Sequence, residues 1–201
     1  MTQRLSADDR RRQLIGIGLQ KLVERPIHEL SLDEVATEAG ISRGLLFHYF
    51  PTKKDFYVAV LEAAARRLLK QTAPDPEAAP AAQLHQSLDA FVAFLERRRE
   101  PYLALMRGTA GGADYVIQVH EDTRAAFTGR VHDALGPESE TPRVRLLVRG
   151  WFSLVEDTAL EWARDRPLPR EELIELLMGS LTALLSTADP DLAGRLEAEE
   201  A

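Results

Sequence analysis

Apolar residues recur at spacings of three and four along most of the chain, rather than at every second position. One such stripe near the N-terminus consists of Ile15, Gly18, Leu19, Leu22 and Val23, and another covers about five turns between residues 144 and 162. A three-four period places side chains on one face of an α-helix, whereas a half-buried strand alternates. No run alternates in this way. The pattern predicts an all-α fold.

Capping residues and helix breakers set the boundaries of about nine expected helices. Ser31 followed by Glu34 has the form of a capping box and begins one short helix, and Gly40 can supply the left-handed residue that ends it. Ser42 caps the next short helix, and Pro51 stops it because the residue before a proline is disfavoured in helical geometry.

The rest of the chain is expected to form longer helices. Thr52 with Asp55 opens one from about Lys53 to Gln71, and the proline-rich segment 73–80 is a connector. Later helices are expected over 81–99, 101–107, 113–135, 142–165 and 170–187. The acidic tail 197–201 is expected to fray.

Residues 31–50, SLDEVATEAGISRGLLFHYF, have the layout of a helix-turn-helix, with a tight turn at Gly40. In such a unit the second helix enters the major groove, which at about 12 Å is wide enough for a helix. On spacing alone, any two short helices around a glycine would look the same.

The order of residues around this segment resembles the DNA-binding domain of the tetracycline-repressor (TetR) family of bacterial regulators. Between Arg11 and about Lys70 the matching positions are Gly18, Ser31, Val35-Ala36, Ala39-Gly40, Ile41-Ser42, Gly44, Leu46, Phe47, Phe50 and Lys53. The resemblance implies a helix-turn-helix DNA-binding domain over residues 1–55. It implies a ligand-binding and dimerisation domain over residues 56–201.

The resemblance also implies which residues contact DNA. They are Ser31, Ser42, Arg43, Gly44, Leu45, Phe47, His48, Tyr49 and Lys53. Ser31 and Lys53 correspond to phosphate contacts at helix N-termini, which attract anions on physical grounds as well. The family commonly has Tyr where this chain has Phe47, and the chain contains no Asn. Direct recognition of bases would therefore depend on a contact between Arg43 and guanine. The shape of the DNA would supply the remaining sequence specificity.

The last two long expected helices suit a homodimer. The segment 170–187 is apolar around nearly its whole circumference, which indicates burial on two sides. The family forms a four-helix bundle between two subunits from the corresponding helices. A two-fold dimer matches a pseudo-palindromic operator in double-stranded DNA.

An aromatic-rich set from several expected helices suggests a site for a small molecule. It comprises Phe91, Phe94, Leu95, Tyr102, Met106, Tyr115, Val119, Phe127, Trp151, Phe152 and Val155, with His120, Glu156 and Asp157 as candidate polar anchors. Aromatic walls with few polar groups are typical of such sites, although these residue types also form ordinary cores. A planar, largely apolar effector is expected, and a buried Glu156 would favour a cationic or hydrogen-bond-donating one.

Composition excludes several other classes of protein. The 201 residues include no Cys, so disulfides, Cys-ligated metals and thiol nucleophiles are absent. The N-terminus lacks the apolar core of a signal peptide, and no apolar run is long enough for a membrane span, so a cytoplasmic protein is expected. HEDTR at 120–124 lacks the second His of HExxH. No metal, cofactor or enzymatic activity is expected.

The net charge of −7 looks unfavourable for binding DNA until it is divided. Residues 1–55 carry 9 Lys and Arg against 8 Asp and Glu, whereas residues 56–201 carry 16 against 24. The acidity therefore belongs to the expected sensing domain. A weakly basic DNA-binding domain in an otherwise acidic chain predicts that DNA binding is salt-sensitive and that the affinity for non-specific DNA is low.

These observations favour a dimeric repressor that a small hydrophobic effector releases from its operator. Two alternatives stay open: a transcriptional activator or partner-sensing regulator without such an effector, and an all-α enzyme acting on hydrophobic substrates. The absence of a nucleophile or metal constellation weighs against the enzyme.

Overall fold

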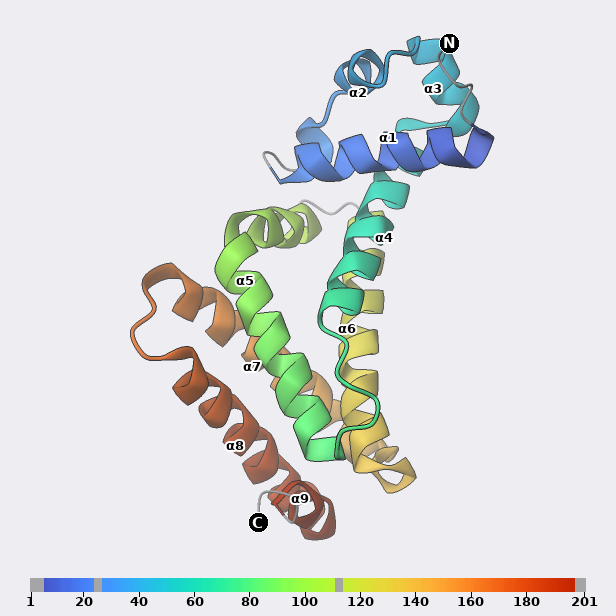
Figure 1. Ribbon diagram of the computed structural model, residues 1–201. Coiled ribbons are helices and arrows are strands. Elements are labelled where there is room, and N and C mark those ends of the chain that lie inside the picture. Colours follow the sequence, from blue (N-terminus) through green and yellow to red (C-terminus); the bar gives the residue numbers. More distant parts are fainter. Residues whose placement is uncertain (1–5, 24–26, 111–113, 198–201) are drawn as a thin grey trace. The chain divides into compact units, whose positions relative to one another are not determined.

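The structure, a computed structural model, describes residues 6–23, 27–110 and 114–197, and every regular element in these ranges is helical (Figure 1). The expected all-α fold is confirmed. The α-helices are α1 (Ala7–Leu22), α2 (Leu32–Glu38), α3 (Arg43–Tyr49), α4 (Lys53–Gln71), α5 (Pro80–Ala110), α6 (Asp114–Leu135), α7 (Pro142–Asp165), α8 (Arg170–Ala188) and α9 (Pro190–Glu197). Two short 3-10 helices, η1 (Ile27–Glu29) and η2 (Pro137–Ser139), join them. None of the described helices is long and apolar enough to cross a membrane.

The expected caps form around the two short helices. The backbone N–H three residues after Ser31 and three residues after Ser42 donates to the serine Oγ, at 3.4 and 3.2 Å. Gly40 has φ +65°, a conformation that costs a residue with a Cβ about 1–2 kcal/mol. The helix α4 has the predicted limits. Capping and turn chemistry are local, which is why the sequence predicts them well.

The two helices expected over 81–99 and 101–107 form one element, α5. It bends at Arg98, whose backbone angles are φ −136° and ψ 33°. Pro101 therefore lies in the first turn after the kink, where its missing N–H disrupts no helical hydrogen bond. The expected break is therefore present as a kink, three residues before the proline.

The C-terminal helix α9 was not predicted. Asp189 begins it, because its Oδ1 accepts hydrogen bonds from the backbone N–H groups of Asp191 and Leu192, at 3.1 and 3.4 Å. Leu192 and Leu196 are buried. The Asp-Pro pair at 189–190 is the sequence signal for this helix start.

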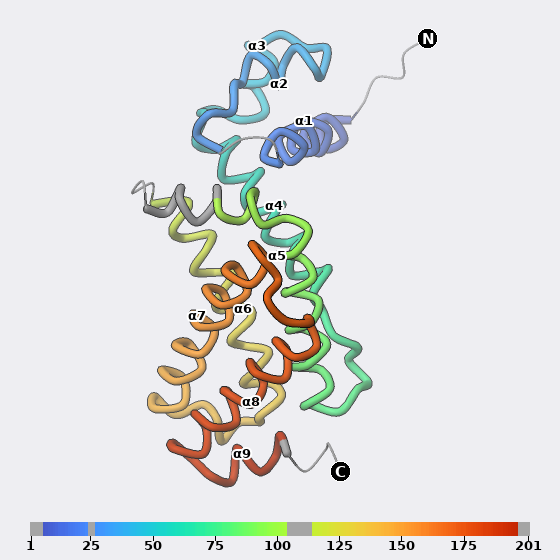
Figure 2. Tube along the Cα trace, turned by 90° about the vertical axis from the view of Figure 1, so that its left-hand side faces the viewer, coloured from blue at the N-terminus to red at the C-terminus, as the bar shows by residue number. Residues whose placement is uncertain are grey.

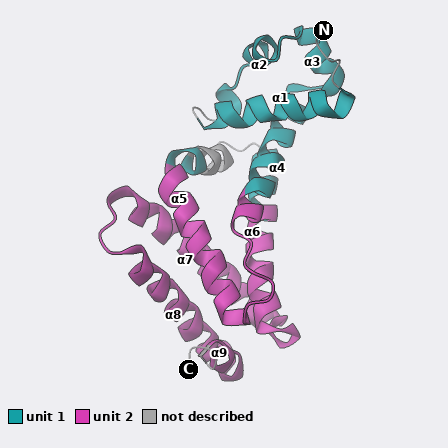
Figure 3. Cartoon of the chain, viewed as in Figure 1, with its two compact units in different colours: residues 1–67, 100–121 teal, residues 68–99, 122–201 magenta. Residues whose placement is uncertain are grey.

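The chain divides into two compact units (Figure 3). Unit 1 contains residues 1–67 and 100–121, and unit 2 contains residues 68–99 and 122–201. The domain boundary expected after residue 55 separates the DNA-binding residues from the rest of the chain. It concerns function, and it stays a prediction.

The core of unit 1 joins α1, α2 and α3 to the first part of α4. Leu14, Leu46 and Phe56 are completely buried in it. Gly18 is required where α1 approaches α4, because a Cβ there would lie 2.5 Å from Cγ2 of Val60. Tyr57 of α4 donates its hydroxyl to the Leu30 carbonyl oxygen at 2.5 Å. The short helices are thus fixed to the start of α4.

In unit 2, α8 contacts both α7 and α9 (Figure 2). The indole N–H of Trp151 on α7 donates to the Leu177 carbonyl oxygen of α8 at 2.9 Å. Three leucines on α7 and α8 are exposed: Leu146 is 72% exposed, Leu154 44% and Leu176 59%. The apolar helix α8 therefore keeps part of its apolar surface uncovered among the described residues.

Candidate nucleic-acid interface and small-molecule pocket

The helices α2 and α3 form a helix-turn-helix within unit 1. The two helices contact each other, and α1 contacts α2. The Ile41 N–H donates to the Ala36 carbonyl oxygen at 3.0 Å across the turn, and Val35 and Leu46 are completely buried. This packing turns one face of α3 inward and leaves the other uncovered.

The predicted DNA-contacting residues differ in exposure. Ser42, Arg43, Gly44, Leu45, His48 and Lys53 are exposed, whereas Ser31, Phe47 and Tyr49 are half-buried. Phe47 and Tyr49 pack against the core of unit 1, and the Tyr49 ring meets His48 edge to face at 5.4 Å between centroids. The outward surface of α3 is therefore carried by its first three residues and His48.

Arg43 stands at the first position of α3 and is held by an acid from α2. Its Nη1 donates to both carboxylate oxygens of Asp33, at 3.2 and 3.0 Å. Its guanidinium carbon lies 5.5 Å from the centroid of the Phe47 ring. Nη2 and Nε have no acceptor among the described residues, so this edge of the guanidinium is available to a guanine. Sequence reasoning missed Asp33, because no spacing rule links it to Arg43.

Basic side chains flank α3 at the start of α4. Thr52 and Asp55 form the expected box: the Thr52 N–H donates to Asp55 Oδ2 at 2.9 Å, and the Asp55 N–H donates to Thr52 Oγ1 at 3.1 Å. Lys53 Nζ lies 5.1 Å from the centroid of the Tyr57 ring. A cation opposes the dipole at a helix N-terminus, so a phosphate beside Lys53 would be doubly stabilised.

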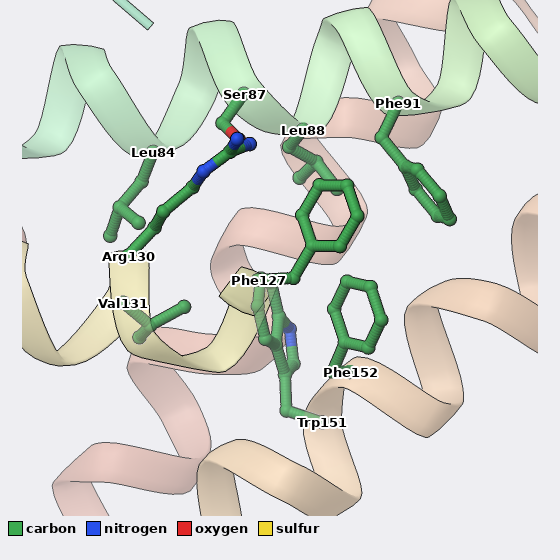
Figure 4. Close-up of a pocket in the computed structure, with 9 residues that line it drawn as sticks. All are labelled: Leu84, Ser87, Leu88, Phe91, Phe127, Arg130, Val131, Trp151 and Phe152. Carbon is green, nitrogen blue, oxygen red and sulfur yellow. The ribbon is translucent and has the colours of Figure 1, made fainter. Parts of the chain in front are cut away.

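Unit 2 contains a pocket between α5, α6 and α7 (Figure 4). Its cavity volume is about 20 Å³, room for about one water molecule, so the lining side chains nearly fill it. Four residues of the expected ligand set line it, namely Phe91, Phe127, Trp151 and Phe152. The rings of Phe127 and Phe152 stack at 5.0 Å, and Phe91 lies 4.9 Å from Phe127. The lining is completed by Leu84, Ser87, Leu88, Arg130 and Val131, which sequence reasoning did not select.

The remaining residues of the expected ligand set do not line this pocket. Phe94, Leu95, Val155, Glu156 and Asp157 belong to unit 2 but lie outside the lining, and Tyr102, Tyr115, Val119 and His120 belong to unit 1. Val119 is part of the core of unit 1. The side chain of Met106 lies outside the described residues. The structure therefore divides the expected set between two units.

Glu156 is buried but already has a cationic partner. Its Oε2 lies 3.2 Å from Nε of Arg124, and the two side chains are 6% and 15% exposed. A buried carboxylate paired in this way has its charge compensated within the protein. The burial of Glu156 therefore gives no reason to expect a cationic ligand.

Comparisons with known proteins agree with this arrangement. Residues 18–60 match the family described as bacterial regulatory proteins, tetR family, and residues 80–184 match the tetracyclin repressor-like C-terminal domain. The transcriptional activator FasR of Mycolicibacterium smegmatis is 29% identical over 182 residues, which cover 86% of this chain and 81% of FasR. The regulator EthR of Mycobacterium tuberculosis is 36% identical over 61 residues, 30% of this chain and 28% of EthR.

Solved structures show the same likeness over nearly the whole chain. A tetR-family transcriptional regulator from Streptomyces coelicolor is 32% identical, with a TM-score of 0.80, covering 96% of this chain and 89% of that one. A putative transcriptional regulator from Pseudomonas aeruginosa has a TM-score of 0.71 at 18% identity, covering 92% and 94% of the two chains, and so shows a shared fold.

Proposed function

Because the chain belongs to the TetR family of bacterial regulatory proteins, it is a DNA-binding transcriptional regulator, and we propose that it acts as a homodimer that leaves its operator when a small molecule binds unit 2. The observation that carries the proposal is the pairing of an exposed recognition helix, α3, with an aromatic pocket in the other unit. The predicted operator is pseudo-palindromic double-stranded DNA.

The exposed leucines of unit 2 support the homodimer. Leu146 and Leu154 on α7 and Leu176 on α8 are all more than two-fifths exposed. Large apolar side chains left exposed can mark an interaction site, and a two-fold dimer would cover them with the same helices of a second copy. The resulting four-helix arrangement agrees with the family resemblance.

The proposed release from DNA is a shift between two populations. The effector would bind more tightly to the form in which the two recognition helices are wrongly spaced. Moving this equilibrium from 99:1 to 1:99 needs about 5.5 kcal/mol of differential affinity. The helix α4 begins in unit 1 and ends in unit 2, so we propose a change in its tilt as the transmitting movement.

We propose repression as the sign of regulation. A repressor that blocks its promoter needs no contact with polymerase, so the DNA-binding head and the pocket suffice. FasR is named an activator, so activation is the second candidate. A reporter driven by a natural promoter that contains the operator separates the two, because deleting the gene for the regulator raises expression from a repressed promoter and lowers expression from an activated one.

A regulator of transcription acts where the chromosome is, so we propose a cytoplasmic location. The similar proteins are transcriptional regulators, and we propose that this chain has no enzymatic activity.

Selection of bound duplexes from a random pool tests the proposal with the full chain. The expected product is an inverted repeat, bound by an even number of subunits in sedimentation experiments, and a compound screen on that duplex should yield molecules that release it. Leu176→Glu should weaken both dimerisation and binding, whereas Gln71→Glu, which adds the same charge at another exposed position, should change neither. A monomer bound to a non-repeated site, or a screen in which nothing releases the duplex, would count against the proposal.

A further inference from the structure

Arg130 carries the only charge among the described residues that line the pocket of unit 2. Its side chain extends from α6 toward Ser87 of α5, beside the aromatic rings (Figure 4). The guanidinium carbon lies 4.9 Å from the centroid of the Phe127 ring. A cation is thus built into the wall of an otherwise apolar site.

The hydrogen bonds of this guanidinium to the described residues all go to neutral oxygens. Nη1 donates to the Thr72 carbonyl oxygen at 2.7 Å, to Thr72 Oγ1 at 3.0 Å and to Ser87 Oγ at 2.8 Å, and Nη2 donates to the Leu69 carbonyl oxygen at 2.6 Å. No carboxylate of the described residues pairs with it. On the same helix, Arg124 pairs with the carboxylate of Glu156. Arg130 therefore differs from its neighbour in lacking an anion.

The surroundings of Arg130 make an anion favourable there. Burial lowers the pKa of the Arg130 guanidinium, because partial desolvation disfavours its charged form. The carbonyl groups at the end of α4 offset only part of this cost, because a helix terminus carries about half a charge. Nε donates to no described residue, and a carboxylate can accept two parallel N–H bonds from one edge of a guanidinium.

We propose that the pocket binds a monocarboxylate with an apolar, ring-bearing body, and that Arg130 is the group that holds its carboxylate. The Ser87 hydroxyl donates to no described residue and is placed to supply a second hydrogen bond. The rings of Phe127 and Phe152 stack on each other in a cavity of about 20 Å³, so they would move apart to admit the apolar body. One cation and one hydroxyl suit a single negative charge, not a dianionic phosphate. The inference rests on the proposed function, since it names the chemistry of the effector.

The same guanidinium links the pocket to the helix that begins in the DNA-binding head. Leu69 and Thr72 belong to the last turn and the end of α4, and Arg130 satisfies their carbonyl groups. A carboxylate at Arg130 therefore shares a cation with the end of α4. The position of this helix end depends directly on the occupancy of the pocket.

Matched probes on the full chain test the proposal. Benzoate, 3-phenylpropanoate and 4-phenylbutanoate are each compared with the alcohol and the amine of the same carbon skeleton, by calorimetry and by the fluorescence of Trp151 at the pocket. At least one acid should bind about tenfold or more tightly than its alcohol, since a hydrogen bond to a charged group contributes about 1.5–3 kcal/mol. The amine should bind most weakly.

Variants assign the preference to Arg130. Arg130→Gln should bring the acid and its alcohol within about twofold, and Arg145→Gln, at an exposed arginine of unit 2, should leave the preference unchanged. Should Arg130→Gln fail to fold, Ser87→Ala serves instead and should reduce the preference in part. Equal affinity of acid and alcohol for the unmodified protein, or no binding of any probe, would overturn the inference.

The outcome is separable from that of the proposed function. If a neutral compound from the screen releases the operator while acids show no preference, the regulator stands and the carboxylate site does not. If acids bind as expected but no compound releases the operator, the site stands and effector control of DNA binding does not.

Discussion

Arg43→Ala is the substitution that most directly tests how this protein reads DNA. Arg43 is exposed at the start of α3, and the two side chains of its ion pair with Asp33 are 62% and 63% exposed. An ion pair so exposed contributes about 1 kcal/mol or less to stability. The variant should therefore fold normally, and a change in its DNA affinity would report on the interface itself.

The expected loss of affinity follows from the contacts that the side chain can make. Nη1 is engaged by Asp33, so the Nη2 and Nε edge remains to donate to O6 and N7 of one guanine. Losing one such bidentate contact costs about 1–3 kcal/mol, which is about a 5- to 150-fold weaker binding. The Asp33 carboxylate, then unpaired, would add repulsion toward phosphate. The loss should be concentrated at one base pair of the operator.

Fluorescence anisotropy with the selected duplex and its single-base variants measures this effect. Replacing the contacted guanine should weaken binding by the unmodified protein but hardly change binding by Arg43→Ala, because the two changes remove the same contact. Arg66→Ala is the matched control: Arg66 is 65% exposed, on α4, and paired with Glu62 at 3.4 Å. If both variants lose the same affinity and Arg43→Ala keeps the full base preference, Arg43 does not read the sequence.

Three further outcomes follow from the structure. Gly18→Ala should destabilise the protein by about 1–3 kcal/mol in thermal unfolding, because its Cβ would press on Val60, whereas Gly16→Ala meets no atom within 4 Å and should be tolerated; equal effects would contradict the close approach of α1 to α4. Glu156→Gln removes the negative charge from a largely buried ion pair and should cost about 3–5 kcal/mol in denaturant unfolding, against about 1 kcal/mol or less for Glu140→Gln in an exposed pair. Operator affinity should fall steeply between low and physiological salt, and an affinity independent of salt would refute a phosphate-based interface.

Much of the DNA-binding head could be predicted because its determinants are close together in the sequence. The caps at Ser31 and Ser42, the left-handed Gly40 and the limits of α4 depend on residues three or four positions apart. The resemblance to the family rests on the same local features. The missed helix α9 also had a local signal, the Asp-Pro pair at its start, which the acidic tail beyond it obscured.

The pocket was predicted only in part, because helical periodicity marks a buried face without saying what covers it. Phe91, Phe127 and Phe152 all line the pocket of unit 2. Val119 is also apolar and lies on the same helix as Phe127, but it belongs to the core of unit 1. The pattern of apolar residues is the same in both cases. Which core each one enters depends on the path of the whole helix.

The sequence by itself determined most of the helices, the family and the helix-turn-helix, since each depends on neighbouring residues. The tertiary structure alone decided the electrostatic partners: Asp33 at Arg43, Arg124 at Glu156, and neutral oxygens around Arg130. The acceptors of Arg130 lie 43 to 61 positions away in the sequence. Coulomb energy and desolvation depend on distance in space, so only the folded chain could show which cation lacks an anion.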